Sequence, residues 1–154
     1  VIRDRAIVNE WQAFLLALNG QQGYFAMGDP DNFGPRGVAT GSPVVDGANQ
    51  KGPTLFTTGW TSSVTGILKK GDCIGLGSGS TARLHKVLED ADSNGDGDAS
   101  LSLWPRVVVS PTNASPIELD DPKSMFWLPD GIPERDIDRL GDMTLTLRVM
   151  EHLV

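Results

Sequence analysis

Cysteine and histidine are scarce in this chain of 154 residues. The single cysteine, Cys73, excludes an internal disulfide framework, because a disulfide needs two thiols. With only two histidines, the sequence also has no HExxH or CxxC spacing, the patterns that hold zinc in many proteins. We therefore predict no disulfide scaffold, no metal site and no cofactor, and the absence of a Gly-x-Ser-x-Gly motif gives no sign of a serine nucleophile.

Positive charge is also in short supply, with 13 lysines and arginines against 20 aspartates and glutamates and a net charge of -7. A groove that holds nucleic acid by neutralising its phosphates is therefore not expected. No stretch approaches the roughly 18 consecutive apolar residues of a membrane span, and no signal peptide is evident. We predict no membrane insertion. The sequence begins at Val1 rather than at methionine, which leaves an upstream segment open.

Glycine and proline are plentiful, at 18 and 10 residues, and they are spread along the chain. Glycine and proline interrupt regular structure, so their even spread favours many short strands joined by tight turns. Only one segment, Asp4–Asn19, has the spacing of an amphipathic helix, with Asp4 as the N-cap and Gly20 after its end. The apolar residues of this helical face are Ile7, Val8, Trp11, Phe14, Leu15 and Leu18.

The rest of the chain predicts a series of short strands. We place them at Tyr24–Met27, Val44–Val45, Thr54–Trp60, Gly66–Leu76 (interrupted at Gly71–Asp72), Arg83–Glu89, Ala99–Val109, Met125–Leu128 and Met143–Glu151. The last is the clearest, because apolar residues alternate with polar ones along it. We expect a mainly β fold with one N-terminal helix (α+β), an antiparallel β-sandwich or barrel, in a single domain over residues 1–154. Residues 54–111, dense in hairpin signals, could form a small β-barrel within it.

The stretch DSNGDGDASLSL, residues 92–103, resembles the start of a calcium-binding EF-hand loop. Asp92, Asn94 and Asp96 alternate and Gly97 follows, as the ligands and the glycine of such a loop do. The twelfth position, however, is Leu103 where a bidentate glutamate is needed. The Asn-Gly and Asp-Gly pairs favour a hairpin loop instead. We therefore predict a solvated turn and no specific calcium site.

Other candidate sites are weak. GLGSGST, residues 75–81, has no lysine where a phosphate-binding loop needs one, so we interpret it as a connection between strands. Glu118 with Asp120 and Asp121 could be drawn as catalytic carboxylates, but an exposed acidic turn is favoured. The tryptophans fit core packing or anchoring of subunit contacts, and Trp60 and Trp127 are the better interface candidates.

The order of segments resembles the distal tail proteins of long-tailed bacteriophages and gene transfer agents, which form the ring at the lower end of the tail tube. The best-matched pieces are LKKGDCIGLGSG, RLHKVLEDA and LWPRV, and the resemblance covers nearly the whole chain. It implies a structural protein of the virion tail tip, assembled in the host bacterial cytoplasm. The subunit would form a hexameric ring that stacks on the tail-tube protein and receives hub or fibre proteins. DNA would pass through without specific binding.

A ring subunit must offer two different faces to its neighbours. We expect these from the first helix with the strand after it and from the closing strand; the candidate interface residues are Trp11, Phe14, Tyr24, Phe25, Trp60, Trp127, Leu145, Leu147 and Arg148. The loops Gly28–Gly41 and Ala91–Ala99 are candidates for contacts along the tail axis. Their residues for such contacts are Asp29, Asp31, Asn32, Phe33, Asp92, Asn94 and Asp96.

Two other interpretations stay open. The chain could be a stand-alone β-barrel or sandwich that binds carbohydrate, with tryptophans as stacking platforms. It could also be a hydrolase with an unrecognised carboxylate pair. A ring former should give higher oligomers in solution, whereas a sugar-binding module or an enzyme should often stay small and show ligand binding or turnover.

Overall fold

A computed structural model of the chain describes residues 2, 4–133, 135–137 and 143–152. The chain forms two compact units. The first, called the helical unit below, consists of Val1–Ala26 with Met125–Val154. The second, called the barrel unit, is the continuous segment Met27–Ser124. One helix and mostly antiparallel strands confirm the predicted mainly β fold with an N-terminal helix.

The predicted helix is present as α1, Arg5–Ala17. It begins where expected, because an Asp4 carboxylate oxygen accepts a hydrogen bond from the backbone N–H of Ala6 at 2.8 Å. The helix ends as the backbone turns left-handed at Asn19 and Gly20, with φ of 50° and 70°. The helix therefore ends two residues before the predicted Asn19: Leu18 is the C-cap, and Asn19 takes the left-handed position that was predicted for Gly20.

The strands of the helical unit form two small sheets. One has the order β1 (Phe25–Met27), β8 (Ser124–Trp127) and β11 (Met150–Glu151), and the other pairs β9 (Arg135–Ile137) with β10 (Met143–Leu145). The buried apolar core of the unit, among the residues described, is small. It consists of Leu15, Leu18 and Leu128, with Phe25, Leu145, Leu147 and Val149 packed at its margin.

The predicted closing strand is correct in its pattern but wrong in its continuity. From Thr144 to Met150, side chains alternate between exposed and half-buried, as the sequence pattern predicts. The backbone, however, pairs with β9 only up to Leu145 and with β8 only from Met150. Residues 146–149 lie outside any strand. The alternation fixes which side chains face the core, but it does not tell which strand, if any, lies alongside.

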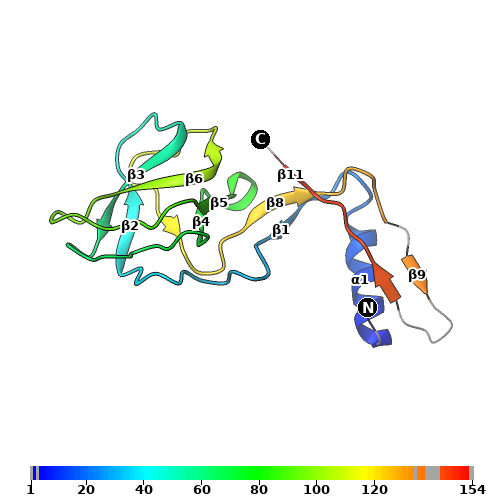
Figure 1. Ribbon diagram of the computed structural model, residues 1–154. Coiled ribbons are helices and arrows are strands. Elements are labelled where there is room, and N and C mark those ends of the chain that lie inside the picture. The colour runs from blue at the N-terminus through cyan, green and yellow to red at the C-terminus, as the bar shows by residue number, and fades with distance from the viewer. Residues whose placement is uncertain (1, 3, 134, 138–142, 153–154) are drawn as a thin grey trace. The chain divides into compact units, whose positions relative to one another are not determined.

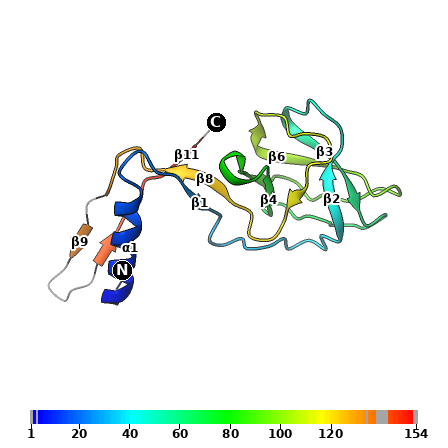
Figure 2. The ribbon, with the colours of Figure 1, turned by 180° about the vertical axis from the view of Figure 1, so that it is seen from behind.

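The barrel unit is a six-stranded antiparallel sheet that curls until its two edges meet (Figures 1 and 2). Its order is β2 (Gly41–Val45), β3 (Gly52–Trp60), β6 (Ala99–Val107), β5 (Arg83–Val87), β4 (Cys73–Leu76) and β7 (Ile117–Glu118). Val45 joins the edges, because its N–H donates to Ser115 O and its carbonyl accepts from Ala114 N–H, each at 2.9 Å. Closure of this kind leaves little unpaired edge.

Alternating side chains fill the barrel. In β6 every second residue from Ala99 to Leu103 points inward, and β3 contributes Leu55, Thr57 and Trp60. The apolar side chains that are least exposed in this core are Val45, Leu55, Ile67, Leu68, Ile74, Val87, Leu101 and Leu103. The segment 54–111 that we expected as a barrel lobe lies inside this unit, which extends further at both ends.

Several element bounds differ from the predicted ones. Gly66–Leu76 is a strand only from Cys73, because residues before it form a turn around the Asp72 carboxylate, which accepts from Lys69 N–H at 2.8 Å. Leu68 keeps one isolated bridge to Ala91. The sequence also gave no signal for the two-residue β7 or for β9, or for the short 3-10 helix η1, Gly79–Thr81. Such short elements lack a period to detect.

Candidate interaction surfaces

The apolar face of α1 is wider than its own unit covers. Leu15 and Leu18 are buried in the core of the helical unit. Ile7, Trp11 and Phe14 lie along the adjacent side of the helix and remain 36% to 43% exposed. We call these three residues the α1 stripe. Large apolar side chains at three and four residue spacing are unusual on a solvated helix, so the stripe is a candidate contact surface.

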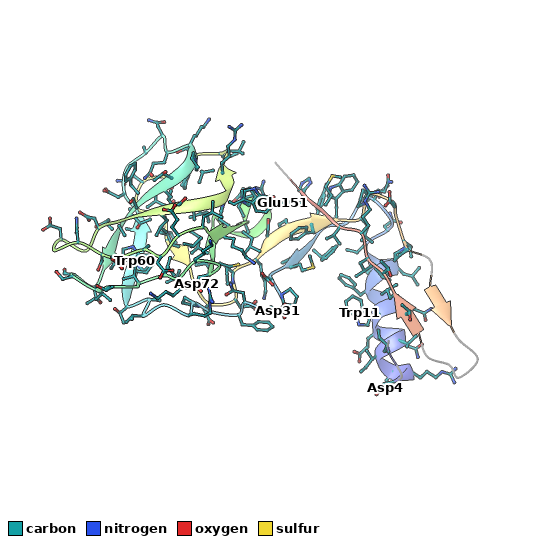
Figure 3. The ribbon with its side chains drawn as sticks, in the orientation of Figure 1. Asp4, Trp11, Asp31, Trp60, Asp72 and Glu151 are labelled. Atoms are coloured by element: carbon teal, nitrogen blue, oxygen red, sulfur yellow. The ribbon has the colours of Figure 1, made fainter. Side chains whose placement is uncertain are left out.

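Aromatic rings connect this stripe to the sheet of the same unit. Trp11 meets Phe14 edge to face with centroids 5.8 Å apart, and Phe14 meets Phe25 in the same way at 5.4 Å. Phe25 lies 6.5 Å from Phe126 in a tilted arrangement. Edge-to-face packing is favourable and fixes ring orientation. Within the stripe, the rings of Trp11 and Phe14 are therefore held in place, and Figure 3 shows Trp11 on the helix.

The other predicted interface residues of the helical unit have different surroundings. Tyr24 is exposed and stacks on His152 with centroids 4.0 Å apart. Trp127, Leu145 and Leu147 are half-buried. Arg148 is exposed and pairs with Asp130 at 3.2 Å, a surface ion pair of small energetic value. Tyr24 thus joins the exposed candidates, whereas the other apolar residues mainly support the unit itself.

Trp60 is a correction to the predicted interface set. It is only 4% exposed and packs in the barrel core, which leaves almost no surface for a neighbouring subunit (Figure 3). Its indole N–H donates to the Thr57 hydroxyl at 2.8 Å, so the polar atom is satisfied inside the barrel. Trp60 is therefore a core residue, as the packing interpretation predicts.

The predicted axial loop Gly28–Gly41 is tied to the barrel along its length. The Asp29 carboxylate pairs with Lys86 at 2.7 Å, and the Asn32 amide donates to Gly71 O at 2.8 Å. The hydrogen bond from Lys86 lowers the pKa of Asp29, and the same bond raises the pKa of Lys86. Asp31 and Phe33 are left exposed. The loop therefore offers an acid and an aromatic ring in a fixed setting.

The strongest of these ties is the buried carboxylate of Asp72. Its Oδ2 accepts from the backbone N–H groups of Arg36, Gly37 and Lys69, and its Oδ1 accepts from Arg36 Nε at 3.0 Å. Burial alone would raise the pKa of Asp72, but these hydrogen bonds outweigh it and the pKa lies below its ordinary value. Asp72 thereby fixes the end of the axial loop to the turn before β4.

The loop Ala91–Ala99 is a turn, as predicted, and the side chains of Asp92 and Asn94 are bonded within the protein. Asn94 Oδ1 accepts from Asp96 N–H and Asp98 N–H, and Asp92 Oδ1 accepts from Gly66 N–H at 2.6 Å. These bonds occupy two of the oxygens that an EF-hand would turn toward calcium. The carboxylate of Asp96 stays at the exposed tip.

The remaining sequence candidates fall into local structural roles. The Gly75–Thr81 stretch contains η1, capped by hydrogen bonds between Ser78 and Thr81. Cys73 is buried, which raises the pKa of its thiol and keeps it protonated at neutral pH. Asp121 pairs with Lys123 at 2.7 Å, and Glu118 Oε1 accepts from Asp120 N–H. Within the described part of the chain, no three His, Cys, Asp or Glu residues cluster as metal ligands would.

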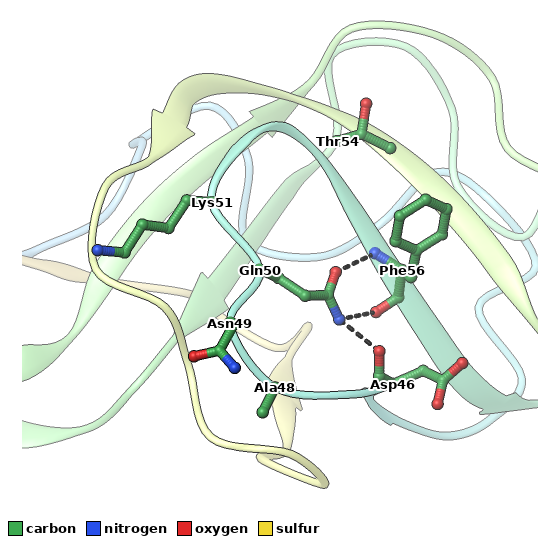
Figure 4. A pocket seen from close by; sticks show the side chains of 7 residues that line it. All are labelled: Asp46, Ala48, Asn49, Gln50, Lys51, Thr54 and Phe56. Atoms are coloured by element: carbon green, nitrogen blue, oxygen red, sulfur yellow. Dashed lines mark hydrogen bonds between the residues drawn. The ribbon is translucent and has the colours of Figure 1, made fainter.

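A hollow of about 450 Å³ lies at the loop between β2 and β3 (Figure 4). Gln50 organises it, donating from Nε2 to Asp46 O and Phe56 O and accepting at Oε1 from Phe56 N–H. The hollow is lined by Asp46, Ala48, Asn49, Gln50, Lys51, Thr54 and Phe56. None of these was a sequence candidate. Phe56 could have been found, since it alternates with the inward-facing Leu55 and Thr57.

Comparison with known proteins adds no family assignment: no family model matches the chain, and no curated protein matches it. In the residues that the structure describes, no helix has the length and apolar character needed to cross a membrane.

Proposed function

We propose that this protein is a ring-forming structural subunit of a phage-like tail tip, of the distal tail protein type. The observation that carries the proposal is the α1 stripe. Ile7, Trp11 and Phe14 form a partly exposed apolar strip on a unit whose own described core has three buried apolar side chains. A small core gains much of its stability when such a strip is covered by a neighbour.

The open edges of the same unit support a ring. A closed ring of identical subunits needs two different faces on each subunit. In the three-stranded sheet, β1 and β11 are edge strands, and residues 146–149 lie in no strand. Unpaired edges invite pairing with another chain. The α1 stripe with Tyr24 would be one face, and the backbone of residues 146–149 with the exposed Arg148 the other.

The axial loops fit contacts above and below such a ring. Asp29, Asn32 and Asp72 hold the first loop, and the side chain of Asn94 holds the second. Both loops therefore keep their shape before any partner arrives, which lowers the entropic cost of docking. The neighbours in this proposal are a tail-tube ring on one side and hub or fibre proteins on the other.

The acidic balance of the chain suits a channel that DNA passes without sticking. A lumen with net negative charge repels phosphates by the same electrostatics that let basic grooves bind them. The net charge of -7 is the support for this part of the proposal. A structure of the assembled ring with a basic lumen would contradict it.

The oligomeric state in solution tests the ring. We expect mass photometry and light scattering to show concentration-dependent higher oligomers, and negative-stain images to show rings. The double variant Trp11→Ala/Phe14→Ser should shift the population to monomers. The matched control is Leu16→Ala, a more exposed apolar position on another side of α1. A wild-type chain that stays monomeric, alone and with the products of its neighbouring genes, refutes the proposal.

The genomic context gives an independent test. A tape-measure gene upstream and hub genes downstream are expected around the gene for this chain. A neighbourhood of sugar-metabolism genes would favour the stand-alone carbohydrate-binding module instead.

A further inference from the structure

The outer face of the barrel carries two exposed aromatic rings, which the tail-ring proposal does not use. Phe56 of β3 and Trp104 of β6 are 56% and 67% exposed. Both alternate with inward-facing leucines, so they lie on the same outer side of neighbouring strands. Aromatic rings supply a large, rigid contact area, and Trp in particular is enriched at binding surfaces.

The strand register gives their spacing. Phe56 pairs with Ser100, and Trp104 lies four residues further along β6, so the backbone positions that carry the two rings are about 13 Å apart along the strand. Between them, Thr54 pairs with Ser102, which places hydroxyl groups on the intervening surface. The face is thus two aromatic platforms separated by a polar strip, unlike the continuous apolar face of a protein interface core.

The hollow beside Phe56 supplies polar groups. The Gln50 amide makes its hydrogen bonds to the backbone of the loop. Asn113 Oδ1 also accepts from the loop, from Gly47 N–H at 2.7 Å. The side chains of Asp46, Asn49 and Lys51 have no hydrogen-bond partner among the described residues, and they border the hollow together with Phe56 (Figure 4). Gln50 fixes the backbone of the loop, so these polar side chains are presented from a fixed position beside an exposed ring and remain available to a ligand.

The charges of these groups decide the chemistry of the ligand. Asp46 and Lys51 contribute one negative and one positive charge, so the hollow attracts neither an anion nor a cation as a whole. A carboxylate accepts hydrogen bonds, an ammonium donates them, and the Asn49 amide does both, which matches a ligand rich in hydroxyl groups. The aromatic platforms require that the ligand also have apolar faces. Pyranose rings combine these two properties.

We propose that the outer face of β3 and β6 binds an uncharged oligosaccharide. Phe56 and Trp104 stack against sugar rings, and Asp46, Asn49 and Lys51 bond to hydroxyl groups at the Phe56 end. Single-stranded nucleic acid also stacks on aromatic rings, but it needs a positively charged track. The balanced charges here favour the neutral ligand. This inference is independent of the tail-ring proposal, because it uses residues of the barrel unit alone.

The test is binding of neutral hexasaccharides to the whole chain. Calorimetry and saturation-transfer NMR would be run with maltohexaose, cellohexaose, chitohexaose, mannohexaose and galactohexaose, and with dodecathymidylate as the nucleic-acid probe. We expect saturable binding of at least one sugar. Phe56→Ala and Trp104→Ala should each weaken it about tenfold, and Asp46→Asn should weaken it less. The matched control, Val109→Ala, removes exposed apolar surface outside the face and should leave binding unchanged.

The outcomes separate clearly. No saturable binding of any of the five sugars overturns the proposal, as does sugar binding that survives in both aromatic variants. Binding of the oligonucleotide in place of the sugars overturns it too. Phe56→Tyr and Trp104→Phe keep a ring and should restore most of the affinity, which shows that losses in the alanine variants come from stacking and not from misfolding. Assembly measured on the same samples reports on the tail ring separately.

Discussion

Replacement of Asp72 by asparagine should destabilise the barrel and release the end of the axial loop. The Asp72 side chain is fully buried, and its two oxygens accept four hydrogen bonds. Asparagine keeps one oxygen for the backbone N–H groups but turns an amide N–H₂ toward Arg36 Nε, which is also a donor. Loss of one charge-assisted bond and weakening of the others should cost about 2–3 kcal/mol of unfolding free energy. Alanine, which leaves all the donors unmatched, should cost about 3–5 kcal/mol.

The measurement combines urea unfolding with amide hydrogen exchange. Val38 N–H donates to Gly66 O and Ala39 N–H donates to Ile67 O, directly after the Asp72 anchor, so their exchange reports on the loop. Faster exchange there is expected in Asp72→Asn. The control is Arg36→Ala, which removes a largely exposed guanidinium but keeps the three backbone donors, and it should cost about 1 kcal/mol. An Asp72→Asn variant as stable as wild type would refute the anchoring role.

Three further outcomes are expected. Trp11→Ala removes the exposed third of an indole from the α1 stripe. It should weaken self-association by about 2 kcal/mol, roughly thirtyfold, as measured by mass photometry. An unchanged oligomer would contradict the proposed contact. Leu101→Ala should cost the barrel about 2–5 kcal/mol in urea unfolding, against little for the exposed Ser100→Ala. The pKa of both Asp29 and Asp72 is lower in the folded chain than in the unfolded chain. The ionised carboxylates therefore stabilise the fold fully above about pH 4, and this stabilisation is lost as the pH falls further. The unfolding free energy of Asp29→Asn should depend less on pH in this acid range than that of the wild type.

Local patterns predicted the elements of this fold better than their partners. The spacing of apolar residues and the Asp4 cap predicted α1, and alternation predicted the inward residues of β6 and, in β3, Leu55 and Thr57. The same alternation did not show that the chain changes sheets between Leu145 and Met150. Pairing depends on contacts distant in sequence, which periodicity does not contain.

The candidate surfaces show the same division. Trp11 and Phe14 were found from helical spacing, but the sequence could not tell how much of the helical face its own unit would cover. Trp60 and Trp104 are the same residue type, and each lies next to a glycine or a proline in the sequence. Trp60 is nevertheless buried, and Trp104 is exposed. Alternation with Leu101 and Leu103 predicts the exposed position of Trp104. The same alternation continued from Leu55 would place Trp60 outside, but the period breaks near Gly59, whose φ is 85°, and Trp60 turns into the core. The hollow beside Phe56 depends on the hydrogen bonds of Gln50, which no local pattern encodes.

The barrel unit enters and leaves the helical unit's sheet at adjacent points of the backbone. Strands β1 and β8 are neighbours in one sheet, and a Cβ placed on Gly28 would lie 2.7 Å from the carbonyl oxygen of Pro122. The barrel is therefore inserted between two neighbouring strands, β1 and β8, at a point where a two-residue turn could join them. Closely spaced ends are what domain insertion requires, so we expect residues 28–123 to tolerate replacement by a short turn or by another domain with closely spaced ends, without any change to the sequence of α1 or the closing segment.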